Sequence, residues 1–164
     1  MNSFGVPQLL EGSRVPGRAN APVTLCVLGT MEASSSGVPV RLGGPTQRAV
    51  LARILVAGGV PVSAERLVEE VWAGRAGPDA VHPFVSRLRK VLGRDGIPQR
   101  RGGYVVDREL VAVDADAFAA EVDDGRRALA RGADADAAVL LEAALARWKG
   151  ERAYAGVADI ADIA

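Results

Sequence analysis

The strongest periodic pattern of hydrophobic and polar positions lies near the middle of the chain, over residues 84–93. At 100° per residue, one side of a helix here carries only apolar side chains: Phe84, Val85, Leu88, Val91 and Leu92. The opposite side carries His82, Ser86, Arg89 and Lys90, with Arg87 on the flank. The major groove of DNA admits one such helix. The stretch alone fits equally well a helix that packs on a core and exposes a basic face to solvent.

Two amphipathic helices are predicted before this segment. The first begins at Pro45, because a proline in the first helical turn loses no hydrogen bond. Its expected buried face consists of Val50, Leu51, Ile54 and Leu55. Ser63 is a good N-cap for the second helix, which runs through Trp72. Its expected inward face consists of Leu67, Val68, Val71 and Trp72. A helix, a turn and then a basic helix is the order found in helix–turn–helix motifs.

A β-hairpin is predicted near the N-terminus. Residues 24–33 form an apolar run that predicts one strand, residues 34–37 have turn chemistry, and residues 38–42 alternate again. Residues 1–22 mix Gly, Pro, Ser and Asn without any periodicity, so we expect a disordered tail there.

A second, shorter hairpin is predicted over residues 97–107. Gly102 and Gly103 form its tip, and Arg100 and Arg101 come directly before it. Arginine on a narrow hairpin can reach a minor groove or its phosphates. This hairpin is therefore a second candidate element for nucleic-acid contact.

Two further helices are predicted after residue 107. The apolar positions of the first are Phe118, Val122 and Leu129, and those of the second are Val139, Leu140, Leu145 and Trp148. Gly132 and Asp134 separate the two helices. Such a pair is one unit of a tetratricopeptide-like stack, which normally needs more units to bury its faces. We therefore expect these helices to pack against the preceding domain.

The distribution of charge favours a nucleic-acid partner, although the chain has no net charge. Residues 86–101 hold six cationic side chains against the single carboxylate of Asp95, which gives +5, whereas residues 107–142 are rich in Asp and Glu. A basic patch on a neutral chain is typical of nucleic-acid binders. We expect a cytoplasmic protein, because we find neither a signal peptide nor an apolar run of membrane-spanning length.

No enzyme, metal or cofactor site is predicted. The single histidine, His82, has no nucleophile or carboxylate partner at a recognisable spacing. The glycine pairs do not match the patterns that cradle phosphates. The single cysteine, Cys26, lies in an apolar run and is interpreted as a small core residue.

The motifs of this chain resemble those of one known family. They are Gly-Gly-Pro-x-Gln-Arg-x-x-Leu from Gly43, Leu-Val-Glu-Glu-Val-Trp from Leu67, Val-Ser-Arg-Leu-Arg-Lys-Val-Leu from Val85, and Gly-Gly-Tyr from Gly102. Over residues 23–107 the chain resembles the winged-helix domain of Streptomyces antibiotic regulatory proteins, which is similar to the effector domains of OmpR/PhoB-type response regulators. Residues 113–118 and 140–150 resemble the opening of the bacterial transcriptional activation domain that follows in this family.

The resemblance implies an α+β winged helix-turn-helix fold, with an N-terminal β-hairpin, three helices and a C-terminal wing, followed by an α-helical TPR-like hairpin. The implied domains are a disordered tail (residues 1–22), a winged-helix domain (residues 23–107) and a truncated helical activation-domain segment (residues 108–164). The family continues with more helices, so we expect either a natural short form or a shortened chain.

The implied function is sequence-specific DNA binding by a transcriptional regulator, as an activator of antibiotic or other secondary-metabolite genes. The resemblance implies binding to direct repeats in double-stranded DNA as a pair of protomers, and recruitment of RNA polymerase. We expect Ser86, Arg87, Arg89 and Lys90 in or beside the major groove, with His82 at the helix start. Arg48 and Arg94 are expected on backbone phosphate, and Arg100 and Arg101 in the wing with Tyr104 packed beneath it.

The alternative is a degenerate winged helix that binds protein, with little or no DNA binding. The connection from Trp72 to Val85 is a few residues shorter than is usual in the family. In addition, Pro83 predicts that the recognition helix begins at His82 or Pro83. A helix that begins there has lost the front turn, whose residues commonly contact bases.

Overall fold

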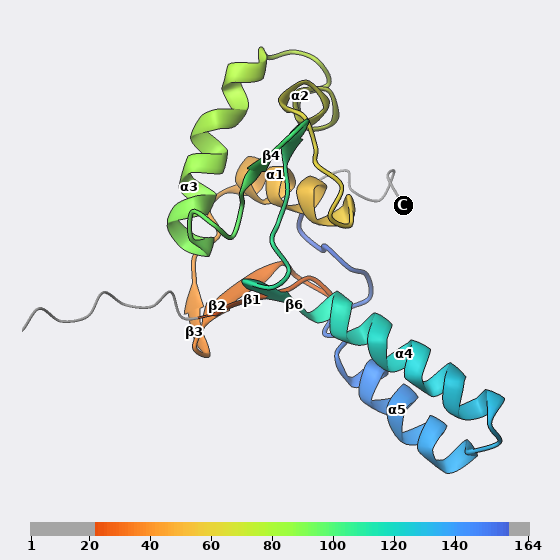
Figure 1. The fold of residues 1–164 in the computed structure, drawn as a ribbon. Coiled ribbons are helices and arrows are strands. Elements are labelled where there is room, and N and C mark those ends of the chain that lie inside the picture. The colour runs from red at the N-terminus through yellow and green to blue at the C-terminus, as the bar shows by residue number, and fades with distance from the viewer. Residues whose placement is uncertain (1–21, 158–164) are drawn as a thin grey trace, which may run out of the picture.

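The computed structural model describes residues 22–157. The predicted tail over residues 1–22 therefore lies outside the described residues, apart from its last residue. Figure 1 shows a mixed α/β body from which a pair of helices projects. In residues 22–157 no helix is both long enough and apolar enough to cross a membrane.

A four-stranded sheet forms one side of the body. It consists of β1 (Val23–Cys26), β2 (Glu32–Ser35), β3 (Val38–Val40) and β6 (Val111–Val113) in the order β3-β2-β1-β6. The first three strands pair antiparallel, whereas β6 runs parallel to β1 with Val23 beside Val111. Side chains alternate between faces along β1, with Val23 and Leu25 buried and Thr24 exposed.

The prediction of one strand over residues 24–33 is wrong, because the chain reverses direction inside that run. Gly29 has φ 143°, a value that side chains rarely allow. The backbone N–H groups of Val27 and Leu28 donate to the carboxylate of Asp114, at 2.8 and 3.3 Å. Val27 and Leu28 are both buried, so the turn has no polar signature in the sequence.

Three helices follow largely as predicted: α1 (Pro45–Val56), α2 (Ala64–Trp72) and α3 (His82–Leu92). The four residues expected on the inner face of α1 are all buried. The hydroxyl of Ser63 accepts from the backbone N–H of Arg66 at 3.2 Å, which confirms it as the N-cap of α2. Trp72 is half-buried, with its ring 5.4 Å from that of Phe84. The contact between these two rings joins α2 to α3.

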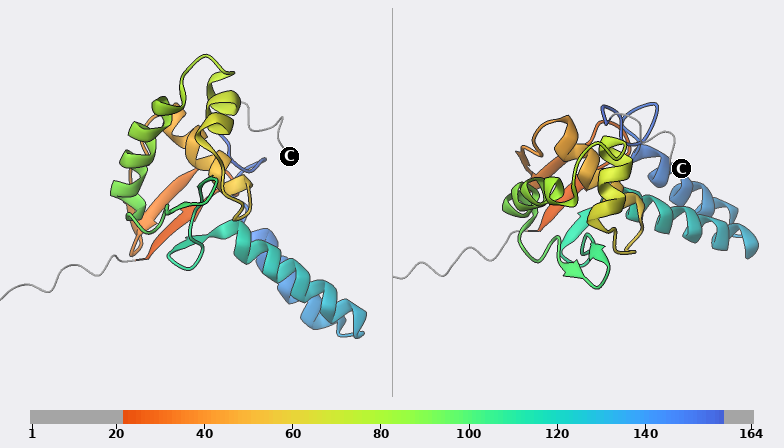
Figure 2. Two further views of the ribbon diagram at one scale, coloured as in Figure 1. Left: turned by 45° about the horizontal axis from the view of Figure 1, so that its top comes forward. Right: turned by 90° about the horizontal axis from the view of Figure 1, so that it is seen from above.

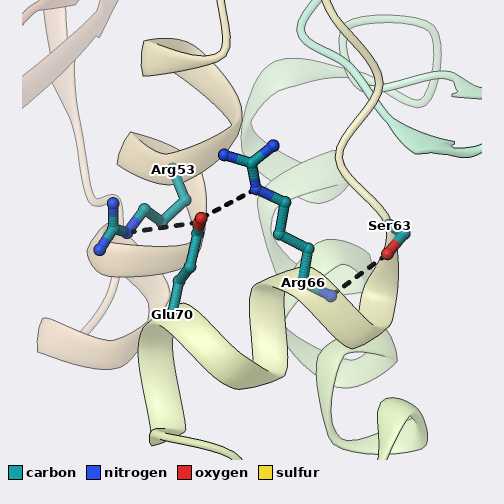
Figure 3. Close-up of polar contacts among 4 residues, drawn as sticks. All are labelled: Arg53, Ser63, Arg66 and Glu70. Carbon is teal, nitrogen blue, oxygen red and sulfur yellow. Dashed lines mark hydrogen bonds and ion pairs between the residues drawn. The ribbon is translucent and has the colours of Figure 1, made fainter. Parts of the chain in front are cut away.

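A polar cluster joins α1 to α2 (Figure 3). The carboxylate of Glu70 accepts from Nε of Arg66 at 2.8 Å and lies 3.7 Å from Nε of Arg53. Burial lowers the pKa of Arg53, and the charge of Glu70 opposes that shift. Glu70 therefore compensates two cations, one of which is nine-tenths buried.

A short 3-10 helix, η1 (Pro78–Val81), leads into α3. Because Val81 has helical dihedrals and a fully buried side chain, the helical path starts one turn before His82. The predicted start of the recognition helix is confirmed, with Pro83 in its first turn. The loss of the front turn of the recognition helix stays a prediction, and the residues directly before α3 form the 3-10 turn of η1.

The predicted second hairpin is present as β4 (Gln99–Arg100) and β5 (Gly103–Tyr104). We call this hairpin the wing. Tyr104 also exchanges two backbone hydrogen bonds with Val62, each 2.9 Å. A Cβ atom on Gly103 would lie 2.0 Å from the carbonyl oxygen of Val62. The wing is thus fixed against the segment just before α2, and glycine is required at that contact.

The last two helices, α4 (Asp114–Ala130) and α5 (Asp134–Ala146), form an antiparallel hairpin. Its buried positions are small residues: Gly125, Ala128, Ala137 and Ala144. The predicted inward positions of Leu129, Val139 and Leu145 are wrong, because at least half of each side chain is exposed. Small residues let the two helix backbones approach closely, which leaves the longer apolar side chains outside.

The helical hairpin does not lie against the body as expected. Both views in Figure 2 show it projecting away, and α4 contacts the sheet at β1 and β6. After α5 the chain returns to the turn between β1 and β2. There the N–H groups of Lys149, Tyr154 and Ala155 donate to that turn's carbonyl groups at 2.7–2.8 Å. The predicted boundary between the two domains, after residue 107, therefore assigns β6 to the helical segment, although β6 is a strand of the body's sheet.

Candidate nucleic-acid interface

The outer face of α3 is polar and cationic, as the periodicity predicts. Val85, Leu88 and Leu92 anchor the helix, with no more than 2% of each exposed. Figure 1 shows α3 on the outside of the body. The side chains exposed on its outer face and at its end are those of His82, Ser86, Arg87, Lys90 and Arg94.

Between α3 and the wing lies a groove of about 440 Å³. The polar side chains that line it are His82, Ser86, Arg89, Lys90, Arg94 and Tyr104. Five residues predicted from sequence as site residues thus meet at one concave surface, with three cations among them. We call this surface the α3–wing groove.

Arg89 lies within this groove rather than on its rim. Its Nε donates to the carbonyl oxygen of Ile97 at 2.9 Å, and its guanidinium carbon lies 5.7 Å from the centre of the Tyr104 ring. Arg89 is half-buried and ties α3 to the chain that enters the wing. Its charge contributes to the groove while its side chain holds the two elements together.

Tyr104 supports the start of α3 from beneath. Its hydroxyl lies 2.8 Å from Nδ1 of His82, and the other ring nitrogen of His82 lies 3.7 Å from the carboxylate of Asp79. Burial raises the pKa of Tyr104, and the charge of Arg89 opposes this rise. The hydroxyl of Tyr104 and Nδ1 of His82 therefore share one hydrogen bond at the start of α3. This network fixes His82 at the mouth of the groove.

The remaining predicted residues lie in three places. Arg87 is on the flank of α3, with its guanidinium carbon 5.5 Å from the centre of the Phe84 ring. Arg101 is exposed in the turn of the wing, and Arg100 pairs with Asp107 at 3.4 Å. Arg48 does not line the α3–wing groove. Its Nε donates to the carbonyl oxygen of Gly43 at 3.2 Å, beside a different cavity.

Sequence reasoning missed the contacts that position the groove. Tyr104 was expected beneath the wing and is buried there, but its link to His82 joins residues far apart in the chain. The bond from Arg89 to Ile97 likewise has no signature in the helical pattern, which shows only a cation on the outer face. A tyrosine after two glycines was the only available signal.

Comparison with known proteins gives matches in both parts of the chain. The model of the family "Bacterial transcriptional activator domain" matches residues 113–162. The transcriptional regulatory protein MoaR1 of Mycobacterium tuberculosis is 35% identical over 136 residues, which cover 76% of this chain and 43% of that protein. The regulatory protein AfsR of Streptomyces coelicolor is 36% identical over 131 residues, which cover 76% of this chain and 13% of that protein.

A solved structure agrees with the fold. It is that of Mycobacterium tuberculosis EmbR in complex with a low-affinity phosphopeptide, with a TM-score of 0.72 and 30% identity. The match covers 80% of this chain and 37% of that one. The chain therefore spans less than half the length of each of these three proteins.

The fold and the matched family define a class: winged helix-turn-helix proteins that carry a bacterial transcriptional activator domain. Within it, the similarity to the regulatory proteins MoaR1 and AfsR confirms the resemblance of the motifs to the Streptomyces antibiotic regulatory protein family.

Proposed function

We propose that this protein is a sequence-specific DNA-binding transcriptional regulator that reads the major groove with α3. The observation that carries the proposal is the α3–wing groove, where cations from an anchored helix face outward beside a second basic element. Helix and hairpin elements of this kind contact adjacent grooves of one duplex. The relatives named above carry regulator names, which supports this class of function over an enzyme.

The side chains have distinct proposed roles. Ser86, Arg87 and Lys90 are exposed along α3 and face the base edges, where one arginine on guanine gives roughly 1–3 kcal/mol of discrimination. Arg94, just beyond the end of α3, contacts a phosphate, and His82 contacts the duplex at the helix start. Arg100 and Arg101 contact the minor groove or its phosphates from the wing. Arg89 acts from beneath by holding α3 to the wing.

The wider role follows from the family. We propose activation of antibiotic or other secondary-metabolite genes, binding to direct repeats by a pair of protomers, and contact with RNA polymerase. The activator-domain match over residues 113–162 supports the activating direction. The alternative of a winged helix without DNA binding rests on the shortened front of the recognition helix and on the short helical segment after it. The regulator names of the relatives favour DNA binding over this alternative.

Selection from a random double-stranded DNA library at two salt concentrations tests the proposal. We expect an enriched sequence whose affinity falls steeply with salt. The variant Arg94→Gln with Arg101→Gln should bind more weakly, with a log–log salt slope smaller by about 2, because two exposed cations proposed to lie on or beside phosphate are lost. The matched control is Arg126→Gln with Arg131→Gln, which removes the same charge from exposed positions of the helical hairpin.

Two results would contradict the proposal. One is the absence of any enriched sequence at low salt. The other is an equal loss of affinity in both double variants, which would mean that binding follows overall charge and not the α3–wing groove. Thermal unfolding of each variant, expected to match that of the unsubstituted protein, keeps stability apart from binding.

A further inference from the structure

A second cavity, of about 700 Å³, lies at the sheet edge beside the segment that leads into α1. Its apolar lining includes Met31, Val40 and Leu42. Its cationic lining comes from three separate segments: Arg41 after β3, Arg48 in α1, and Lys149 after α5. It shares no residue with the α3–wing groove, so DNA reading by α3 leaves its composition unexplained.

The three cations outnumber the carboxylates that face this cavity. Within residues 22–157, no ion pair joins Arg41, Arg48 or Lys149 to an acidic side chain. Glu32 is the only carboxylate in the lining, so the described lining has a net charge of +2. A concentration of unpaired cations above an apolar floor favours an anion with an apolar body.

The position of Lys149 is fixed by the backbone. Its N–H donates to the carbonyl oxygen of Leu28 at 2.8 Å, and its ammonium group lies 3.8 Å from the sulfur of Cys26. The cation is therefore brought to the sheet by the segment that returns from the helical hairpin. An occupant of the cavity would contact both the body and this returning segment.

We propose that this cavity binds an amphipathic organic anion, with the carboxylate or phosphate head held by Arg41, Arg48 and Lys149 and the apolar part against Met31, Val40 and Leu42. The volume lies within the range of small-molecule sites, roughly 300–1,000 Å³. The proposal concerns a ligand site separate from the DNA interface and does not depend on DNA binding.

Cys26 provides the readout. It is the only cysteine of the chain, it lines the cavity, and it is half-buried. Alkylation by iodoacetamide, followed by intact-protein mass spectrometry, would be timed with decanoate, decyl phosphate or decanol present below the concentrations at which they aggregate. Both anions should slow alkylation and neutral decanol should not. The stronger of the two anions identifies the head group.

The matched variants localise the effect. Arg41→Gln with Lys149→Gln replaces two exposed cations, and should weaken protection by the anions about tenfold or more, since charged hydrogen bonds are lost. Arg126→Gln with Arg131→Gln should leave protection unchanged. As a second measurement, backbone amide shifts of Gly43 and Lys149 should move on addition of the protective anion.

Three outcomes would overturn the proposal. They are no slowing by either anion, equal slowing by decanol, and protection that survives Arg41→Gln with Lys149→Gln. None of them bears on whether α3 reads DNA, because the thiol measurement contains no nucleic acid.

Discussion

Gly103 has the closest backbone approach in the wing. Its φ of 147° and the 2.0 Å separation between a hypothetical Cβ and the carbonyl oxygen of Val62 exclude a side chain there. Gly102, next to it in the turn, has φ 96° and open space around it. Two adjacent glycines therefore serve different purposes: one permits a tight turn, and the other permits contact between two backbones.

At this scale we predict that Gly103→Ala destabilises the protein far more than Gly102→Ala. Gly102→Ala, the control, should lower the free energy of unfolding by about 1 kcal/mol, because it introduces backbone strain alone. Gly103→Ala should cost roughly 2–4 kcal/mol, because it also separates β5 from Val62 and breaks two hydrogen bonds. Urea unfolding measures both, and equal losses would show that the contact with Val62 is unimportant.

The elements differ in how far sequence alone could predict them. The pattern was sufficient for α1, α2 and α3, because α2 and α3 each have one buried face and α1 begins at a proline in its first turn. The pattern could not separate β1 from β2, since the turn between them is buried. Nor could it reveal β6, because its parallel partner β1 is far away in the sequence. In α5 apolar residues surround the helix, so its pattern does not indicate a unique inward face.

The candidate site shows the same division. The cationic face of α3 and the arginines of the wing follow from local pattern. The anchoring role of Arg89 and the separation of Arg48 from the groove depend on contacts between distant segments. Local periodicity carries no information about such contacts.

At the scale of the helical hairpin, we predict a dependence of stability on pH. Arg147 donates two hydrogen bonds to Glu121, with Nε at 2.7 Å, and these bonds lower the pKa of Glu121. A carboxyl with a lower pKa in the folded state contributes stability above its unfolded pKa of roughly 4.3. That contribution is lost as pH falls through the lower folded value.

The measurement compares the unsubstituted protein with Glu121→Gln. At pH 7 the variant should unfold at a lower urea concentration, and the difference should shrink as the pH is lowered below about 4. A difference that stays constant with pH would mean that Glu121 acts through packing instead of charge.

The whole molecule is held together at the turn between β1 and β2. Asp114, the first residue of α4, accepts two backbone N–H groups from that turn, and the segment after α5 donates to its carbonyl groups. This loop therefore joins the body both to the start of the helical hairpin and to the segment that follows it. Its polar groups are satisfied by residues from the far end of the described chain.

At this scale we predict that Asp114→Asn lowers the free energy of unfolding by roughly 1–3 kcal/mol, because one carbonyl oxygen replaces a charged pair of acceptors. Asp136→Asn, at an exposed position in the first turn of α5, is the matched control and should change it by less than about 0.5 kcal/mol. Thermal unfolding of both variants decides the matter; similar melting temperatures would contradict the assigned role.

The pairing of β1 with β6 affects how this protein folds while it is being synthesised. On the ribosome β1 emerges before the other strands and helices that the structure describes, yet its parallel neighbour β6 is made only after α1, α2, α3 and the wing. Until then the nascent chain carries an open strand edge, which is a template for association with other chains. The late arrival of Val111–Val113 closes that edge. The sheet of the body can therefore be completed only after Val111–Val113 has been synthesised.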